Sequence, residues 1–277
     1  EVLWICPLLS WHAQSFDNEP GLDQYWDGIV PIEELVSDYN FCIWPSHMSQ
    51  SSDDVADAID AMNADNWRKL PKQDLEAAKA VLAASSETRA EAFTRLITFS
   101  HFVPRLEVNP EKRFLFNPNL AKGIGSNALR TRVLRHRPDL HVFGHTHFGW
   151  DAVVEGTRYI QAPLSMPRER SRLPSTAIGY YPNFDKPQPL LLRNADATWA
   201  ETYEAAFSQY YSRYPREPSK VRAASGPIYS NNIWKGAGPK PTIEDVFEGR
   251  LQPWELAPRW MQEKVGMVAS QGRAKAH

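Results

Sequence analysis

The residues of this chain that could do chemistry are histidines placed directly after apolar runs. Gly144-His145-Thr146-His147 follows the short run Leu140–Phe143. Along an extended backbone, residues two apart point the same way, so we expect His145 and His147 to present both imidazoles to one side. Neutral imidazole is the commonest metal ligand among protein side chains. The spacing therefore predicts a metal site just beyond this run.

A third histidine has a similar setting. His101 ends the apolar run that begins at Arg95. The pair Val103-Pro104 stops that run, because the restricted pre-proline residue and the missing N–H of proline disfavour continuation of the strand. In α/β sheets, ligands gather beyond the carboxyl ends of the strands. We therefore predict that two strands ending in histidine contribute to one shared site, with three metal ligands: His101, His145 and His147.

Alternating apolar and amphipathic segments must position these histidines. Three runs are typical of buried strands, a fourth apolar run is strand-like, and Gly156 lies at the centre of an expected hairpin. Helical spacing and capping residues predict the intervening helices. The expected strands are 2–6, 39–44, 95–101 and 140–143, and the expected helices are 53–70, 73–84, 87–95, 127–137 and 199–211. This alternation predicts an α/β layered fold.

The Ser100-His101 pair and the Gly144–His147 string resemble the C-terminal motifs of the calcineurin-like metallophosphoesterases, over residues 2–192. The resemblance implies a two-layer β-sandwich flanked by helices. It also implies two divalent metals, Mn, Fe or Zn, with His101 and His145 on the second metal and His147 on the first. The implied activity is hydrolysis of a phosphate mono- or diester by a metal-activated hydroxide at a dinuclear centre.

The chain departs from that family's pattern upstream. The motifs G-D-x-x-D/N and G-N-H-D/E are absent, and the only D-x-H string, Asp139-Leu140-His141, precedes its strand, so we interpret His141 as structural. Three neutral imidazoles without a bridging carboxylate cannot hold two dications close together. An abrupt strand at Val2 suggests the hypothesis of an N-terminally truncated domain, in which the catalytic groups precede Glu1. Whether this chain turns over a substrate on its own stays open.

Two other functions remain. The first alternative is a non-catalytic, phosphoesterase-like binding protein with a partial metal site, and the second is a mononuclear zinc site with three histidine ligands. Candidate substrate-binding residues are Arg168 and Arg170, whose guanidinium groups suit phosphate oxygens, and His12, which follows the first strand.

Composition narrows the partners. Lys and Arg number 31 against 33 Asp and Glu, a formal charge of −2 that disfavours nucleic acid as the main partner. No run approaches the roughly 20 apolar residues that cross a bilayer, and two cysteines make no disulfide framework, so we expect a soluble, intracellular protein. We expect a phosphoesterase domain over 1–193 and a mostly irregular or helical extension over 194–277.

Overall fold

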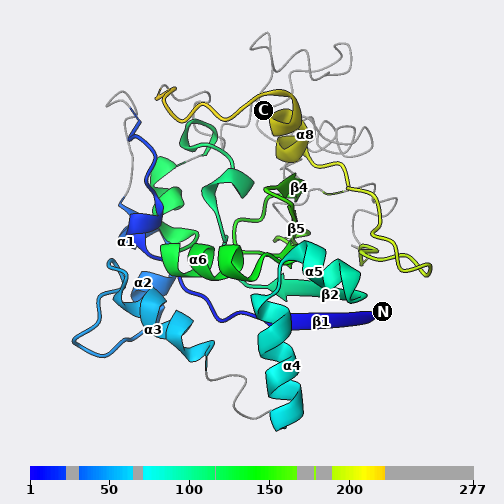
Figure 1. Ribbon diagram of the computed structural model, residues 1–277. Coiled ribbons are helices and arrows are strands. Elements are labelled where there is room, and N and C mark those ends of the chain that lie inside the picture. Colours follow the sequence, from blue (N-terminus) through cyan, green and yellow to red (C-terminus); the bar gives the residue numbers. More distant parts are fainter. Residues whose placement is uncertain (23–30, 65–70, 116, 167–177, 179–188, 222–277) are drawn as a thin grey trace, which may run out of the picture.

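The computed structural model describes residues 1–22, 31–64, 71–115, 117–166, 178 and 189–221 (Figure 1). Its centre is a five-stranded sheet in the order β1-β2-β3-β5-β4. Strands β1, β2, β3 and β5 are mutually parallel, and β4 runs antiparallel to β5 as the second arm of a hairpin. The strands are β1 Val2–Pro7, β2 Thr94–Phe99, β3 Leu140–Val142, β4 Trp150–Val154 and β5 Thr157–Gln161.

Helices connect and cover these strands. Helices α4 and α5 contact β2, α6 packs against α3 and α4, and α8 lies against β4 (Figure 1). The bounds are α1 Ile32–Leu35, α2 Asp38–Phe41, α3 Asp54–Met62, α4 Lys72–Ala83, α5 Ser86–Glu91, α6 Asn127–His136 and α8 Ala206–Arg213. Helix α6 begins where the Ser126 hydroxyl accepts a hydrogen bond from Leu129 N at 3.3 Å, the N-cap contact that its sequence predicts.

Buried apolar clusters lie on both faces of the sheet, as is usual for a mainly parallel sheet, although Val2, Leu3 and Ile5 of the edge strand β1 are exposed. On one face, Leu96, Phe143 and Trp150 pack with α6 and with Phe207 of α8. On the other face, a smaller cluster forms around Ile97, Leu140, Ile160, Ile178 and Ala205. The α/β prediction is therefore confirmed.

The expected β-sandwich is wrong, because the strands of the described residues all belong to one sheet. The strand expected at 39–44 is also wrong. Residues Asp38–Phe41 form the short helix α2, and Phe41 and Ile43 are 82% and 95% exposed, so this apolar run finds no sheet to join. Helix α3 ends at Met62, well before residue 70, and residues 65–70 lie outside the described part of the chain.

The helix expected at 199–211 begins later, at Ala206, because Trp199 instead forms a β-bridge with Arg193. Helix α8 then packs into the main core through Phe207 and Tyr210. The domain boundary at 193/194 stays a prediction.

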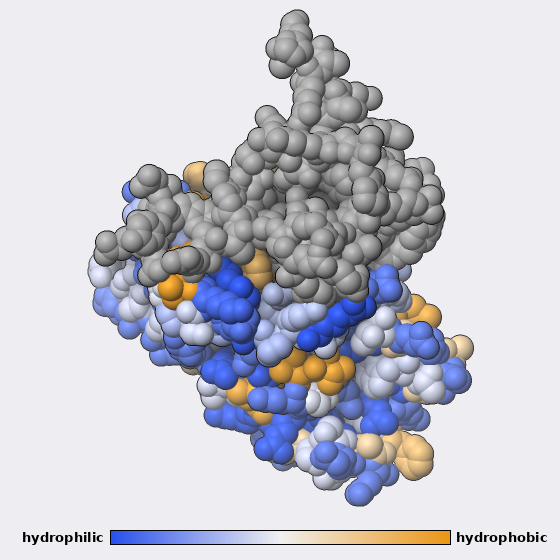
Figure 2. Space-filling model, turned by 90° about the horizontal axis from the view of Figure 1, so that it is seen from above, coloured by the Kyte–Doolittle hydropathy of each residue, from blue (hydrophilic) through white to orange (hydrophobic). Residues whose placement is uncertain are grey.

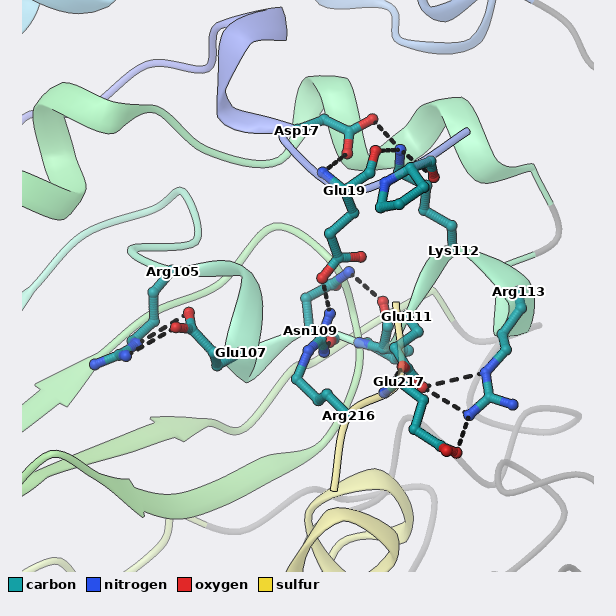
Figure 3. A network of polar contacts seen from close by, with 12 residues as sticks. Asp17, Glu19, Arg105, Glu107, Asn109, Glu111, Lys112, Arg113, Arg216 and Glu217 are labelled. Atoms are coloured by element: carbon teal, nitrogen blue, oxygen red, sulfur yellow. Dashed lines mark hydrogen bonds and ion pairs between the residues drawn. The ribbon is translucent and has the colours of Figure 1, made fainter. Parts of the chain in front are cut away.

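A cluster of charged residues ties three distant segments together (Figure 3). Lys112 Nζ lies 2.7 Å from Asp17 Oδ2 and donates to the Glu19 carbonyl at 2.7 Å. Arg216 Nη2 donates to Glu19 Oε1 at 2.6 Å, and the Tyr211 hydroxyl donates to Glu111 Oε2 at 3.1 Å. These charges are paired and hydrogen-bonded, which is what buried charges require. The cluster therefore anchors the segment after α8 to the rest of the fold.

None of the helices within the described ranges is both long and apolar enough to span a bilayer. Figure 2 shows one face of the molecule, on which the described surface is mostly hydrophilic and its apolar residues lie in small separate groups. The two cysteines, buried Cys6 and half-buried Cys42, are both free.

Candidate functional site

The histidines gather at one edge of the sheet. His12 follows β1, His101 follows β2 and His145 follows β3, and these three strands are parallel neighbours. Because the carboxyl ends of parallel neighbours lie at the same edge, the loops after them meet there. The side chains of His101 and His145, 44 residues apart in sequence, are in direct contact.

The contact between these two imidazoles has a defined arrangement of protons. His145 Nε2 lies 2.9 Å from the Gly123 carbonyl oxygen, which can only accept, so Nε2 carries the hydrogen and donates it. The lone pair of His145 is then on Nδ1, and His101 Nε2 lies 3.2 Å from it. In the metal-free neutral pair, His101 Nε2–H therefore donates to His145 Nδ1.

The loop that carries His145 is strained. Thr146 N donates to the Gly144 carbonyl at 3.0 Å, which places His145 at the centre of a three-residue turn with φ 77. His147 also has a positive φ, 59. Positive φ is uncommon for residues other than glycine and costs on the order of 1–3 kcal/mol, and such strain concentrates at functional sites.

This turn corrects the argument that placed His145 and His147 on one side of an extended strand. The backbone is not extended at either residue, so the rule for residues two apart does not apply. His147 makes a minor contribution to the lowered pKa values of both His101 and His145. However, among the described residues no group of three or more His, Cys, Asp or Glu side chains is arranged to hold a metal ion.

Glycine at position 144 permits the close approach of the two loops. Gly144 N donates to the His101 carbonyl at 3.0 Å, and a Cβ atom at Gly144 would lie 3.3 Å from that same oxygen. Phe102, which follows His101, fills the space beneath the pair: its ring centroid is 5.1 Å from His101 and 4.6 Å from His145. The pair is thus fixed by backbone and by packing.

Desolvation lowers the pKa values of His145 and His101. It lowers the pKa of His145 to about 3, with a further contribution from the neighbouring His101. It also lowers the pKa of His101, where the Asp38 carboxylate opposes the effect and His147 adds to it. A neutral imidazole with a lone pair on the facing nitrogen is the form that binds a metal.

The geometry of the pair fits two positions of a metal site. Two nitrogens bound to one tetrahedral cation at about 2.0–2.1 Å lie roughly 3.3 Å apart. His101 Nε2 and His145 Nδ1 lie 3.2 Å apart, and a proton on His101 Nδ1 in place of Nε2 would leave two lone pairs facing each other. The N···N separation therefore matches two ligand positions, and among the described residues no set of three or more ligands is assembled around it.

His12 is completely buried beside this pair. Its Nε2 atom lies 3.3 Å from Gln50 Nε2 and 3.8 Å from Asp38 Oδ2, while its Nδ1 atom is buried without a hydrogen-bond partner in the described structure. Burial lowers the pKa of His12 to about 4, and Asp38 opposes that shift. As placed, His12 influences the site through its neighbours, and its predicted role in substrate binding stays a prediction.

Asp38 and Gly123 are functional candidates that sequence reasoning missed. Asp38 supplies a carboxylate whose charge reaches both His12 and His101, and Gly123 fixes the His145 tautomer through its carbonyl. No sequence pattern marks a backbone carbonyl as the hydrogen-bond partner of a histidine. Asp38 directly precedes the strand that was expected at 39–44, and no motif singled it out. Arg168 and Arg170 lie outside the described residues, so their predicted contacts with phosphate stay predictions.

The chain was compared with family models, curated proteins and solved structures. No family model matches the chain, and no curated protein matches it. Among solved structures, the chain resembles the crystal structure of phosphopantetheinyl hydrolase (PptH) from Mycobacterium tuberculosis, with a TM-score of 0.37 and 16% sequence identity. The match covers 60% of this chain and 50% of that protein.

The resemblance to the calcineurin-like metallophosphoesterases is therefore corrected. No family model, that of the calcineurin-like group included, matches the chain, and the described strands form one sheet where the family implies a sandwich. Short strings of glycine and histidine after a strand occur in many unrelated ligand-binding sites, so such a string does not by itself indicate membership of a family. Function has to be argued from the site itself.

Proposed function

We propose that this protein is a metal-dependent hydrolase of phosphate esters in which His101 and His145 hold a divalent cation. One observation carries the proposal: the facing nitrogens of two neutral imidazoles lie 3.2 Å apart at the carboxyl edge of a parallel sheet. Imidazole suits Zn, Fe and Mn, which are the metals to test. His147, two residues after His145 in the same loop, is the candidate third ligand.

The charge of the site supports an anionic substrate. Neutral imidazoles leave a dication's charge undiminished, and Asp38 is the nearby carboxylate that acts on His101. A site with this net positive charge attracts phosphate oxygens, and Arg168 and Arg170 are proposed to contact them. When bound, such a cation polarises a phosphoryl oxygen and lowers the pKa of a coordinated water.

The chain's own residues orient the ligands. The Gly123 carbonyl accepts the Nε2–H of His145 and so directs the Nδ1 lone pair toward His101. Partners of this kind fix the tautomer and the ring orientation of a metal-binding histidine. Asp38 Oδ2 lies 3.8 Å from His12 Nε2, and the carboxylate opposes the lowering of the His101 pKa.

The proposal is tested with the full chain and two chromogenic substrates, p-nitrophenyl phosphate and its diester. We expect turnover only with added Mn²⁺, Fe²⁺ or Zn²⁺, and we expect His101→Ala to abolish both metal binding and turnover. His47→Ala, at an exposed histidine remote from the pair in sequence, is the matched control and should retain both. Hydrolysis that proceeds without metal, or that survives His101→Ala, rejects the proposal.

A non-catalytic metal-binding protein is the second candidate. It is favoured by the ligand count, because the described residues offer no assembled set of three or more His, Cys, Asp or Glu ligands. Its signature is weak binding of one cation per chain without turnover of either ester. Metal stoichiometry by equilibrium dialysis, read beside the activity assay, separates the two candidates.

A further inference from the structure

A buried chain of hydrogen bonds leads from the centre of the sheet to the loop that carries His101. His141 in β3 is completely buried and is the register partner of Thr98 in β2. Thr98 Oγ1 lies 2.7 Å from His141 Nδ1, and Ser100 Oγ lies 3.0 Å from His141 Nε2. Ser100 Oγ then donates to the Phe102 carbonyl at 2.8 Å.

The direction of every proton in this chain follows from its last member. The Phe102 carbonyl can only accept, so the Ser100 hydroxyl donates its one hydrogen to that carbonyl. His141 Nε2–H must then donate to Ser100 Oγ, and His141 Nδ1 accepts from the Thr98 hydroxyl. Burial lowers the pKa of His141 to about 3, which agrees with a single neutral tautomer.

The last bond of the chain encloses His101. Ser100 and Phe102 flank it, so the Ser100 Oγ to Phe102 carbonyl bond closes a tight loop around this residue. Ser100 N also donates to the Val142 carbonyl at 3.0 Å, and the His101 carbonyl accepts from Gly144 N at 3.0 Å. These contacts hold the backbone of His101 from both sides while leaving its side chain exposed toward His145.

We propose that Ser100, oriented by His141, is a positioning residue that aims His101 Nε2 at His145 Nδ1. This inference rests on the proposed function for its purpose, but the geometry it explains exists without metal. His141 keeps the Ser100 hydrogen directed at the Phe102 carbonyl by donating to the serine oxygen. Loss of the Ser100 hydroxyl removes the bond that closes the loop Ser100–Phe102 around His101. The backbone of that loop can then rotate together with the Phe102 ring, which packs on both histidines.

Thr98 supplies a matched control. It bonds to the same histidine through the opposite nitrogen and is also buried, but its hydroxyl forms no hydrogen bond to the described loop of His101. Ser100→Ala and Thr98→Val each remove one hydroxyl from the same chain. A purely structural network predicts that both variants lose stability and that neither alters the His101–His145 pair selectively.

Two measurements decide the matter on the full chain. Imidazole ¹⁵N NMR of the metal-free protein reads the tautomers of His101 and His145, and Co²⁺ titration reads the affinity of the pair. We expect Ser100→Ala to mix the His101 tautomers and to weaken Co²⁺ binding by about tenfold, as loss of an outer partner of a metal ligand does. Thr98→Val should retain the wild-type tautomers and affinity, and Ser100→Thr, which keeps the hydroxyl, should restore both.

If Ser100→Ala fails to fold, His141→Asn replaces it, because this side chain can still accept from Thr98 but is too short to donate to Ser100. Wild-type tautomers and affinity in Ser100→Ala, or equal losses in Thr98→Val, overturn the positioning role. A wild-type protein that binds no Co²⁺ overturns the proposed metal site, whereas the NMR measurement still decides the role of Ser100.

Discussion

His145 Nδ1 faces His101 Nε2 at 3.2 Å, and the Gly123 carbonyl holds the other nitrogen of His145 at 2.9 Å. One ring nitrogen is thus committed to the backbone and the other is directed at a second histidine. Partial burial lowers the pKa values of both rings. Three loops that are far apart in sequence hold this arrangement of the two rings.

The strained turn at His145 gives the first prediction. We compare His145→Gly with His145→Ala, because both remove the imidazole and differ mainly in how well they tolerate φ 77. The glycine variant should have a free energy of unfolding about 1 kcal/mol higher than the alanine variant, measured by urea denaturation. Equal stabilities would mean that the solution backbone at this position does not have a positive φ.

The buried His141 predicts a pH dependence of stability. Its pKa is about 3 in the folded chain, below the ordinary 6.5, so the unfolded chain takes up the proton first as pH falls. The contribution of neutral His141 is complete above pH 6.5 and is lost progressively as pH falls toward 3, by on the order of a few kcal/mol.

The variant His141→Leu isolates this contribution. The ring of Tyr159 lies 5.9 Å from the His141 ring, between ring centroids. Burial raises the pKa of Tyr159, so the Tyr159 side chain is neutral between pH 3 and pH 7. We expect the stability gap between wild type and variant to narrow from pH 7 to pH 4 in urea titrations. A gap that is constant with pH would show that His141 does not titrate with the depressed pKa.

A buried ion pair joins the hairpin to the segment before α8. Arg158 Nε and Nη2 donate to the two carboxylate oxygens of Asp151 at 2.9 and 2.6 Å, and Tyr203 N donates to Asp151 Oδ2 at 2.8 Å. We expect Asp151→Leu to cost about 3–5 kcal/mol of unfolding free energy, because it leaves the buried guanidinium uncompensated. The double variant with Arg158→Met should be more stable than Asp151→Leu alone.

The exposed pair Lys79–Glu76, at 2.8 Å within α4, is the control. Removing Lys79 should change the stability by less than about 0.5 kcal/mol, since exposed pairs are weak. A double variant at Asp151 and Arg158 that is as unstable as the sum of the two single variants would contradict the interpretation of a coupled buried pair.

Gly125 allows two loops near the site to cross. A Cβ atom there would overlap the Val103 carbonyl and lie 2.8 Å from the ring of Phe16. Gly125→Ala should therefore lower the free energy of unfolding by about 1–3 kcal/mol, as overpacking does. Gly21→Ala is its control, because a Cβ atom at Gly21 meets nothing within 4 Å. Thermal unfolding of both variants is the measurement, and equal midpoints would contradict the predicted clash.

Much of the fold follows from local patterns. Residues that alternate or repeat at helical spacing predict β1, β2, β3, the hairpin and helices α4 to α6. The full burial expected of the first strand is wrong, because β1 is an edge strand on which Val2, Leu3 and Ile5 are exposed. The run at 39–44 has apolar residues but no strand to pair with, so a local helical turn forms there. The second sheet was expected from a family resemblance, and no local pattern required it.

The sequence by itself determined that histidines follow adjacent strand ends, because the placement of His101 and His145 after apolar runs is readable from residue order. Only the tertiary structure decided which of them meet. The turn at His145 abolishes the alternation that was expected to pair it with His147, and the partners that fix its tautomer and its pKa come from Gly123 and His101. Such contacts depend on how loops remote in sequence cross, and local residue patterns do not encode that crossing.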